Sequence, residues 1–204
     1  MHSKEVQLLF TLYRQNDSVF AMLYPRNILI TGGSSGIGEA LALYYAASGV
    51  FLALSGRNND RLNAIAKKCE AKGAIVKAAL VDVTDYNAMK EWIEDVDHHC
   101  PLDLVIANAG ISGGTAGLDK GEEISQIQNI FSVNVDGVFH TIEPALKKMS
   151  ERNAGQIAIV SSLAGFRGWP GAPAYSASKG AVRFYGEALR GALKDTNIKN
   201  TLTI

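Results

Sequence analysis

The sequence predicts an α/β protein in which helices cover both faces of one parallel, doubly wound sheet. Short apolar runs rich in β-branched residues alternate with longer stretches whose apolar residues recur at helical spacing. Strands and helices in this alternation favour right-handed crossovers and a three-layer arrangement. With 204 residues, 47% of them hydrophobic, the chain is long enough for one sizeable core, so we expect a single domain at residues 25–204.

The amino-terminal half supplies three strands, each followed by a helix. Residues 27–31 form a β-branched run that ends in glycines, which is typical of a buried parallel strand entering a tight turn. The next helix keeps its spacing until Ser48-Gly49, where the chain turns into a second strand. The other elements expected in this half are strand 50–54, helix 60–72, strand 75–81 and helix 85–99.

The alternation continues in the carboxyl-terminal half. The elements expected there are strand 104–107, a long helix from about 124 to 149, strand 156–160, a helix from about 175 to 194 and strand 201–204, inside which the chain stops. Doubly wound sheets bind ligands at the carboxyl ends of their strands. The polar residues that follow these strands are therefore the candidate site residues.

Composition bears on the kind of partner and on the compartment. Twenty basic residues balance twenty acidic ones, which argues against a nucleic-acid or anionic-lipid surface and favours small-molecule partners. Cys69 and Cys100 are too few for a disulfide framework, so we expect a reducing, cytoplasmic environment. The most apolar run, 41–54, is interrupted by Ser48-Gly49 and is shorter than the ~18 residues of a membrane span.

Residues 1–24 are expected to be an amino-terminal extension of uncertain structure. They lack the small-residue cleavage site of a secretory signal. They are either an added helix or, as we favour, residues ahead of the true start at Met22.

A glycine-rich turn, Thr31-Gly-x-x-x-Gly-x-Gly38, follows the first strand. Glycines let the backbone approach a ligand, while the free N–H groups and dipole of a helix start favour a pyrophosphate. The alternative is a plain strand-to-helix turn, and the commoner dinucleotide spacing is Gly-x-Gly-x-x-Gly. A strand before and a helix after favour the dinucleotide site. Its candidate cofactor-binding residues are Gly32, Ser34, Ser35, Gly36, Ile37 and Gly38.

Three further strand ends carry candidate cofactor contacts. Arg57 stands where an acidic residue would favour NAD, so it indicates NADP through its 2′-phosphate, with NAD as the alternative; otherwise it is a solvated arginine. Asp82 either accepts from an adenine amino group or helps cap the next helix. Asn108, Ala109 and Gly110 are small residues that let a cofactor lie close.

The carboxyl-terminal half carries candidate catalytic residues. Tyr175 and Lys179 lie four apart on one face of the expected helix, and a cation beside a phenol favours its phenolate form, although such pairs also occur on solvated faces. Asn134 lies in an apolar helical stretch, where a buried amide needs partners. It is either a satisfied core residue or the holder of a local backbone distortion.

Other motifs have plainer explanations. Adjacent histidines point in different directions from a helix, so His98-His99-Cys100 indicates a solvated helix end and not a metal site. His140 is expected to be a packed or capping residue. The sequence contains no Gly-x-Ser-x-Gly elbow, so serine hydrolase chemistry has no support.

Taken in order, these motifs resemble the short-chain dehydrogenase/reductase family over about residues 26–204. The motifs are Thr31-Gly-x-x-x-Gly-x-Gly38, Asn108-Ala-Gly110, Asn134, Ser162 and Tyr175-x-x-x-Lys179. Ser162 precedes Tyr175 by 13 residues, the gap typical of the family, which selects it over Ser161. The resemblance implies a Rossmann fold, an NADP or NAD cofactor, a small carbonyl or alcohol substrate, and a homodimer or homotetramer.

The resemblance also implies the roles of four catalytic residues. In reduction, Tyr175 gives its proton to the carbonyl oxygen while the carbon receives hydride from nicotinamide, and Ser162 hydrogen-bonds that oxygen. Lys179 holds the nicotinamide ribose and favours the phenolate of Tyr175. Asn134 positions a water that links Lys179 to solvent. The protein supplies orientation and charge.

Two features depart from the family pattern. Ala107 stands where many relatives have an asparagine. The family leads us to expect a Pro-Gly turn, a substrate-covering segment and a last strand after Ile204, so we expect a domain truncated at its carboxyl-terminal end. The sequence is then either a fragment or a chain that stops where a mobile lid begins.

Two functions follow as hypotheses. The first is an NADP-preferring carbonyl reductase or alcohol dehydrogenase. Its loop before Tyr175 lines the pocket mouth in relatives, and the residues that indicate an apolar substrate there are Phe166, Trp169, Pro170 and Ala172. The second is a non-catalytic dinucleotide-binding regulatory or scaffold protein of the same fold. The complete set of four catalytic residues favours the first.

Overall fold

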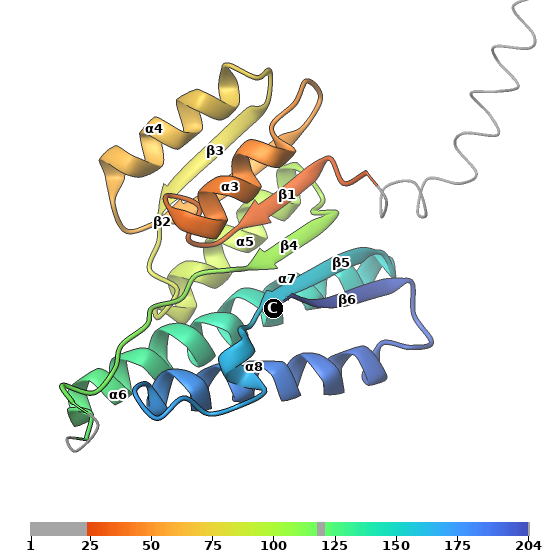
Figure 1. Ribbon diagram of the computed structural model, residues 1–204. Coiled ribbons are helices and arrows are strands. Elements are labelled where there is room, and N and C mark those ends of the chain that lie inside the picture. The colour runs from red at the N-terminus through yellow and green to blue at the C-terminus, as the bar shows by residue number, and fades with distance from the viewer. Residues whose placement is uncertain (1–23, 118–120, 204) are drawn as a thin grey trace, which may run out of the picture.

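The structure, a computed structural model, describes residues 24–117 and 121–203. Parallel strands form one six-stranded sheet in the order β3-β2-β1-β4-β5-β6, and helices pack on both of its faces (Figure 1). The strands are β1 (Asn27–Ile30), β2 (Phe51–Gly56), β3 (Ile75–Leu80), β4 (Leu104–Ala107), β5 (Gly155–Val160) and β6 (Ile198–Thr203). The expected three-layer Rossmann fold is confirmed. The hypotheses about the first residues of the chain fall on 1–23, outside the described residues.

The helices alternate with these strands as expected. The α-helices are α3 (Gly36–Tyr45), α4 (Asn59–Glu70), α5 (Tyr86–His99), α6 (Ile124–Phe131), α7 (Gly137–Arg152) and α8 (Pro173–Ala192). Two short turns, the π-helical η1 (Ser132–Asp136) and the 3-10 turn η2 (Leu163–Gly165), lie among them.

Alternate residues of each central strand are buried on opposite faces of the sheet. Ile28 and Ile30 pack with residues of α3 and α4, whereas Leu29 packs with residues of α5 and α7. All three side chains are fully buried. Burial of one such side chain stabilises a fold by ~1.5–3 kcal/mol. Because both faces are covered, the strands carry continuous apolar runs in place of an alternating pattern.

Strand β6 begins earlier than the sequence predicts. It starts at Ile198 and not at residue 201, because the buried Ile198 side chain belongs to the core and its backbone pairs with Gly155. The polar residues Lys199 and Asn200 conceal this edge strand in the sequence.

The strand order reverses between β1 and β4, whose other neighbours are β2 and β5. Ile30 and Ile106 are paired across the two central strands. Just beyond them, the Thr31 hydroxyl accepts hydrogen bonds from the N–H groups of Asn108 and Ala109, both at 3.1 Å. The carboxyl ends of β1 and β4 are therefore held together at the point where doubly wound sheets bind ligands.

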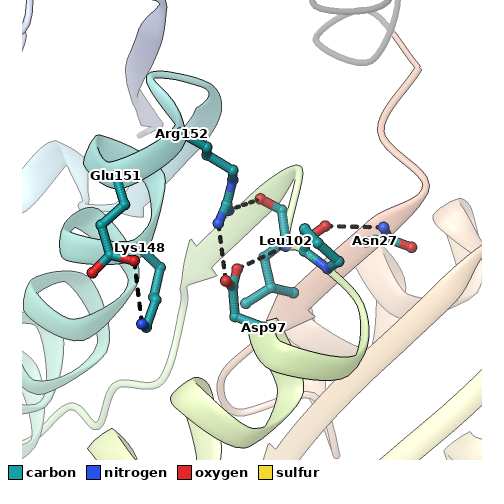
Figure 2. A network of polar contacts seen from close by, with 7 residues as sticks. Asn27, Asp97, Leu102, Lys148, Glu151 and Arg152 are labelled. Carbon is teal, nitrogen blue, oxygen red and sulfur yellow. Dashed lines mark hydrogen bonds and ion pairs between the residues drawn. The ribbon is translucent and has the colours of Figure 1, made fainter.

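At the other ends of the strands, a polar network joins α5 and α7 to the segment that precedes β4 (Figure 2). The carboxylate of Asp97 in α5 accepts from the N–H of Leu102 and from the guanidinium of Arg152 in α7, both at 2.9 Å. Arg152 also donates to the Leu102 carbonyl oxygen at 2.8 Å. Asp97 is buried, and a buried carboxylate needs such partners. The network therefore fixes the ends of α5 and α7 against the segment that enters β4.

Candidate active site

A cavity of about 610 Å³ lies at the carboxyl ends of β1 to β5. Its wall is formed by residues that follow different strands, which the parallel sheet brings to one edge. The candidate site residues that line it are Gly32, Ser34, Ser35, Gly36, Ile37, Arg57, Asp82, Asn108, Ala109, Gly110, Tyr175 and Lys179. The fold thus gathers in one place residues that are scattered along most of the chain.

The glycine-rich turn between β1 and α3 forms one wall of the cavity. Gly32 and Gly36 have φ angles of +67° and +56°, which residues with a Cβ rarely adopt. Gly38 lies behind this wall, where a Cβ would be 2.2 Å from the carbonyl oxygen of Gly32. The Ser35 side chain, just before α3, makes no capping hydrogen bond. The start of α3 therefore keeps backbone N–H groups available for an anionic group.

The ends of β2 and β3 carry an ion pair at the cavity. Arg57 lies 3.9 Å from Asp82, and both side chains are substantially exposed, so the pair contributes little to stability. The Oδ1 atom of Asp82 accepts from the N–H and the hydroxyl of Thr84. Asp85, and not Asp82, caps α5 by accepting from Ala88. The Asp82 carboxylate therefore stays at the cavity wall.

Further polar residues of this region that line the cavity were not found from the sequence. Arg61 lines the cavity from the first turn of α4, and its N–H donates to the side chain of Asn58 at 2.9 Å. Ser55 also lines the cavity; it is fully buried, and its Oγ has no hydrogen-bond partner among the described residues. Arg61 stands four residues after Arg57, in the first turn of the helix that follows β2, and this second basic residue near the strand end is the signal that could have found it. A serine inside an apolar strand gives no such signal.

Asn134 joins the loop after β4 to α8. The helix expected at 124–149 is divided into α6 and α7 by the π-helical η1, which contains Asn134. Both alternatives therefore apply, because Asn134 is fully buried and lies in a local backbone distortion. The Oδ1 of Asn134 accepts from the N–H of Ile111 at 2.8 Å. Its Nδ2 donates to the Ile111 carbonyl oxygen at 2.9 Å and to the Ser178 hydroxyl at 3.0 Å. That hydroxyl donates to the carbonyl oxygen of Tyr175 at 2.7 Å.

Tyr175 and Lys179 both face the cavity from the first half of α8. The Nζ of Lys179 lies 6.0 Å from the centroid of the Tyr175 ring and donates to the carbonyl oxygen of Val160 at 3.0 Å. Lys179 is 4% exposed, and burial lowers its pKa from 10.5 to about 8. A Cβ at position 110 would lie 3.4 Å from Nζ, so Gly110 leaves room beside the ammonium group.

The two serines after β5 make different contacts. Ser161 lines the cavity, and its hydroxyl donates to the carbonyl oxygen of Lys179 at 2.9 Å. The hydroxyl of Ser162, the expected catalytic serine, accepts from the N–H of Ala164 at 3.1 Å at the start of η2. Ser162 is half-buried and is not among the residues that line the cavity. Its catalytic role therefore stays a prediction.

The histidines outside the cavity have structural surroundings. The Nδ1 of His140 lies 2.8 Å from the carbonyl oxygen of Val83, as expected of a packed residue. His98 and His99 are exposed at the end of α5. Over residues 24–117 and 121–203, no group of histidine, cysteine or carboxylate side chains could hold a metal ion. In the same part of the chain, we find no helix with the length and apolar character of a membrane span.

The fold and the cavity define a doubly wound α/β protein with a glycine turn and a tyrosine and lysine pair at one sheet edge. The profile of the short chain dehydrogenase family matches residues 26–203. The chain belongs to this family, which confirms the resemblance of its motifs.

Relatives of known sequence support the same assignment. The chain is 40% identical to an uncharacterized oxidoreductase of Myxococcus xanthus, over 86% of this chain and 69% of that protein. It is 34% identical to 3-ketodihydrosphingosine reductase of Mus musculus, over 86% of this chain and 54% of that protein. The chain therefore spans between 54% and 69% of the length of these two relatives.

Solved structures share the fold. A short chain dehydrogenase/reductase from Burkholderia phymatum in complex with NAD has a TM-score of 0.81 at 27% identity, covering 87% of this chain and 64% of that one. A putative NAD(P) dependent gluconate 5-dehydrogenase from Beutenbergia cavernae with bound NADP has a TM-score of 0.80 at 25% identity, covering 88% and 71%.

Proposed function

We propose that the protein is an NAD(P)-dependent oxidoreductase that interconverts a carbonyl compound and a secondary alcohol. The observation that carries this proposal is that Tyr175 and the buried Lys179 line the same cavity as the glycine turn. A phenol on the cavity wall, with a buried ammonium group one helical turn away on the same helix, gives the site a group that can donate and accept the proton that this interconversion requires. The NAD and NADP held by structurally similar family members support the choice of cofactor.

The cavity has the features that a dinucleotide needs. The positive φ of Gly32 and Gly36 exposes the backbone at the start of α3, which suits a pyrophosphate. At the end of β2, the buried and unpartnered Ser55 hydroxyl is available to a ribose or adenine group. A nicotinamide cofactor bound here would supply the hydride.

The side chains of the protein would position the cofactor and substrate and transfer the proton. Tyr175 gives its proton to the carbonyl oxygen in reduction and takes it back in oxidation. Lys179 would hold the ribose hydroxyls of the cofactor, and Ser162 would donate a hydrogen bond to the reacting oxygen. Asn134 fixes the turn of α8 that carries Tyr175 through Ser178, besides its predicted role in holding a water near Lys179.

We infer a preference for NADP from the basic side chains at the polar end of the cavity. Arg57 and Arg61 both line it, and no carboxylate other than Asp82 is among the lining residues. A guanidinium group binds a phosphate through charge-assisted hydrogen bonds, which are stronger than its exposed contact with Asp82 at 3.9 Å. A 2′-phosphate would therefore be favoured over a free hydroxyl.

Two proposals, on substrate and on assembly, rest on the family resemblance. Phe166 and Trp169 are 53% and 61% exposed and line a groove of about 500 Å³ beside the start of α8. No described residue of this groove lines the cavity, so the apolar substrate expected from them stays a prediction. The homodimer or homotetramer that the resemblance implies also stays a prediction. Light scattering of the purified chain would measure the assembly.

The variant Tyr175→Phe tests the catalytic proposal. It should lower NADPH-dependent reduction of a panel of aliphatic and aromatic ketones by roughly 10²–10⁴-fold, because it removes the only proposed proton donor. Binding of NADPH, measured by fluorescence titration, should be unchanged. Tyr185→Phe is the matched control, because this phenol lies on α8 against Phe139 and not at the cavity.

Two outcomes would contradict the proposal. Substantial activity in Tyr175→Phe would remove Tyr175 from the chemistry. A wild type that binds NADPH but reduces none of the ketones would favour the alternative, a non-catalytic dinucleotide-binding regulatory or scaffold protein.

A further inference from the structure

The amino-terminal end of α8 lacks a cap of its own. The residue before the helix is Ala172, whose side chain cannot accept a hydrogen bond, and Pro173 in the first turn has no N–H. The first N–H group that needs a partner belongs to Ala174, which is 6% exposed. Buried backbone N–H groups are almost always paired. The acceptor must therefore come from another segment of the chain.

Glu122 supplies this acceptor from the segment that leads into α6. Its Oε2 accepts from the N–H of Ala174 at 2.6 Å. Its Oε1 accepts from the side-chain amide of Gln126 at 3.2 Å, and that amide also donates to the carbonyl oxygen of Gly114 at 3.0 Å. The half-buried carboxylate is thus held in place by Gln126 in the first turn of α6. The negative charge of Glu122 also interacts favourably with the positive, amino-terminal end of the α8 dipole.

A backbone contact joins the same two segments. The N–H of Thr115 donates to the carbonyl oxygen of Gly171 at 2.9 Å. A Cβ at Gly114 would lie 2.5 Å from that oxygen, so the two backbones approach closely just before α8 begins. The helices α6 and α8 also pack against each other and lie side by side (Figure 1). The Glu122 contact is therefore part of a formed interface and not an isolated surface contact.

We propose that Glu122 is a positioning residue for Tyr175, because it caps α8 from another segment and so fixes where the phenol enters the cavity. Tyr175 directly follows Ala174, so loss of the cap frees the turn that carries the phenol. Lys179 lies one turn further along and keeps its own anchor on Val160. The geometry between phenol and ammonium thus depends on the cap. The catalytic consequence rests on the proposed function, whereas the capping does not.

Amide hydrogen exchange on the full 204-residue chain tests the cap. In Glu122→Ala, exchange at Ala174 should accelerate about tenfold or more, while Val182 in the buried middle of α8 should not change. Glu122→Gln should stay close to the wild type, because its amide oxygen still accepts. Glu123→Ala is the matched control, since this neighbouring carboxylate is exposed and makes no capping hydrogen bond. Unchanged exchange at Ala174 in Glu122→Ala would overturn the proposal.

The position of the phenol is read without turnover from the ¹³Cζ resonance of Tyr175, assigned with Tyr175→Phe. This resonance should move in Glu122→Ala and return towards the wild-type position in Glu122→Gln. Equal movement in both variants would show an effect of the lost charge and would contradict positioning through the cap. Neither measurement uses cofactor or substrate. An inactive wild type would therefore count against the oxidoreductase proposal alone.

Discussion

The ammonium group of Lys179 is buried and therefore poorly solvated. Burial disfavours the ammonium form and lowers the pKa of Lys179 from 10.5 to about 8, although its hydrogen bond to Val160 remains. The unfolded chain keeps the ordinary pKa, so between these two values the unfolded state binds more protons than the folded state. Below pH 8 both states are protonated and the folded state bears the full cost of desolvation. Stability from this group therefore rises as the pH increases from about 8 towards 10.5.

This rise of stability with pH gives a prediction for Lys179→Met. The free energy of unfolding of the wild type, relative to the variant, should rise by roughly 3 kcal/mol as the pH increases from below 8 to 10.5. Urea denaturation at a series of pH values measures the difference. Lys199→Met is the control, because Lys199 is exposed and its replacement should leave the difference nearly constant. A constant difference for Lys179→Met as well would mean that the ammonium group is not desolvated.

At the scale of elements, η1 shows what a helical pattern can and cannot predict. The apolar residues over 124–149 indicated one helix, because α6, η1 and α7 follow one another without a break in the chain. Asn134 marked the place of the distortion, since a polar side chain in an apolar stretch needs partners. Its partners could not be predicted, because Ile111 and Ser178 lie 23 and 44 residues away in the chain.

The prediction at this scale concerns Asn134→Ala. The change removes three hydrogen bonds and leaves the N–H and carbonyl oxygen of Ile111 without the partners that they have in the folded state. We expect the free energy of unfolding to fall by about 2–4 kcal/mol, measured by urea denaturation. Asn129→Ala on the exposed face of α6 should change it by less than ~0.5 kcal/mol. A similarly small change for Asn134→Ala would show that η1 does not depend on the amide.

At the scale of the whole molecule, the alternation of strands and helices predicted the layers, the ends of the strands at which the cavity lies and most of the cavity wall. Contacts between distant segments were not predictable, because nothing local to either partner marks them. Glu122 lies 52 residues from Ala174, and Arg152 lies 55 residues from Asp97. Ser55 was missed for a related reason, since a serine in a buried strand has the pattern of a packed residue until the cavity beside it is known.

Cofactor binding should stabilise the whole molecule by mass action. NADPH at a hundred times its Kd should stabilise the fold by ~2.7 kcal/mol and raise the Tm by roughly 5–10 °C. NADH at the same concentration should raise it less. The double variant with Arg57→Ala and Arg61→Ala should reduce the NADPH shift to that of NADH, as measured by scanning calorimetry. Arg190→Ala, at the exposed last turn of α8, is the control. Equal shifts for both cofactors in the wild type would contradict the NADP preference.

The network of Asp97, Leu102 and Arg152 lies before β4, whereas the cavity lies after it. The four residues of β4 separate them by about 13 Å, and substitutions that far apart usually have additive effects. Substitutions for heat stability could therefore be made in this network, and substitutions that alter the proposed catalytic activity could be made at the cavity. A directed-evolution library split between the two ends would let each trait be selected without loss of the other.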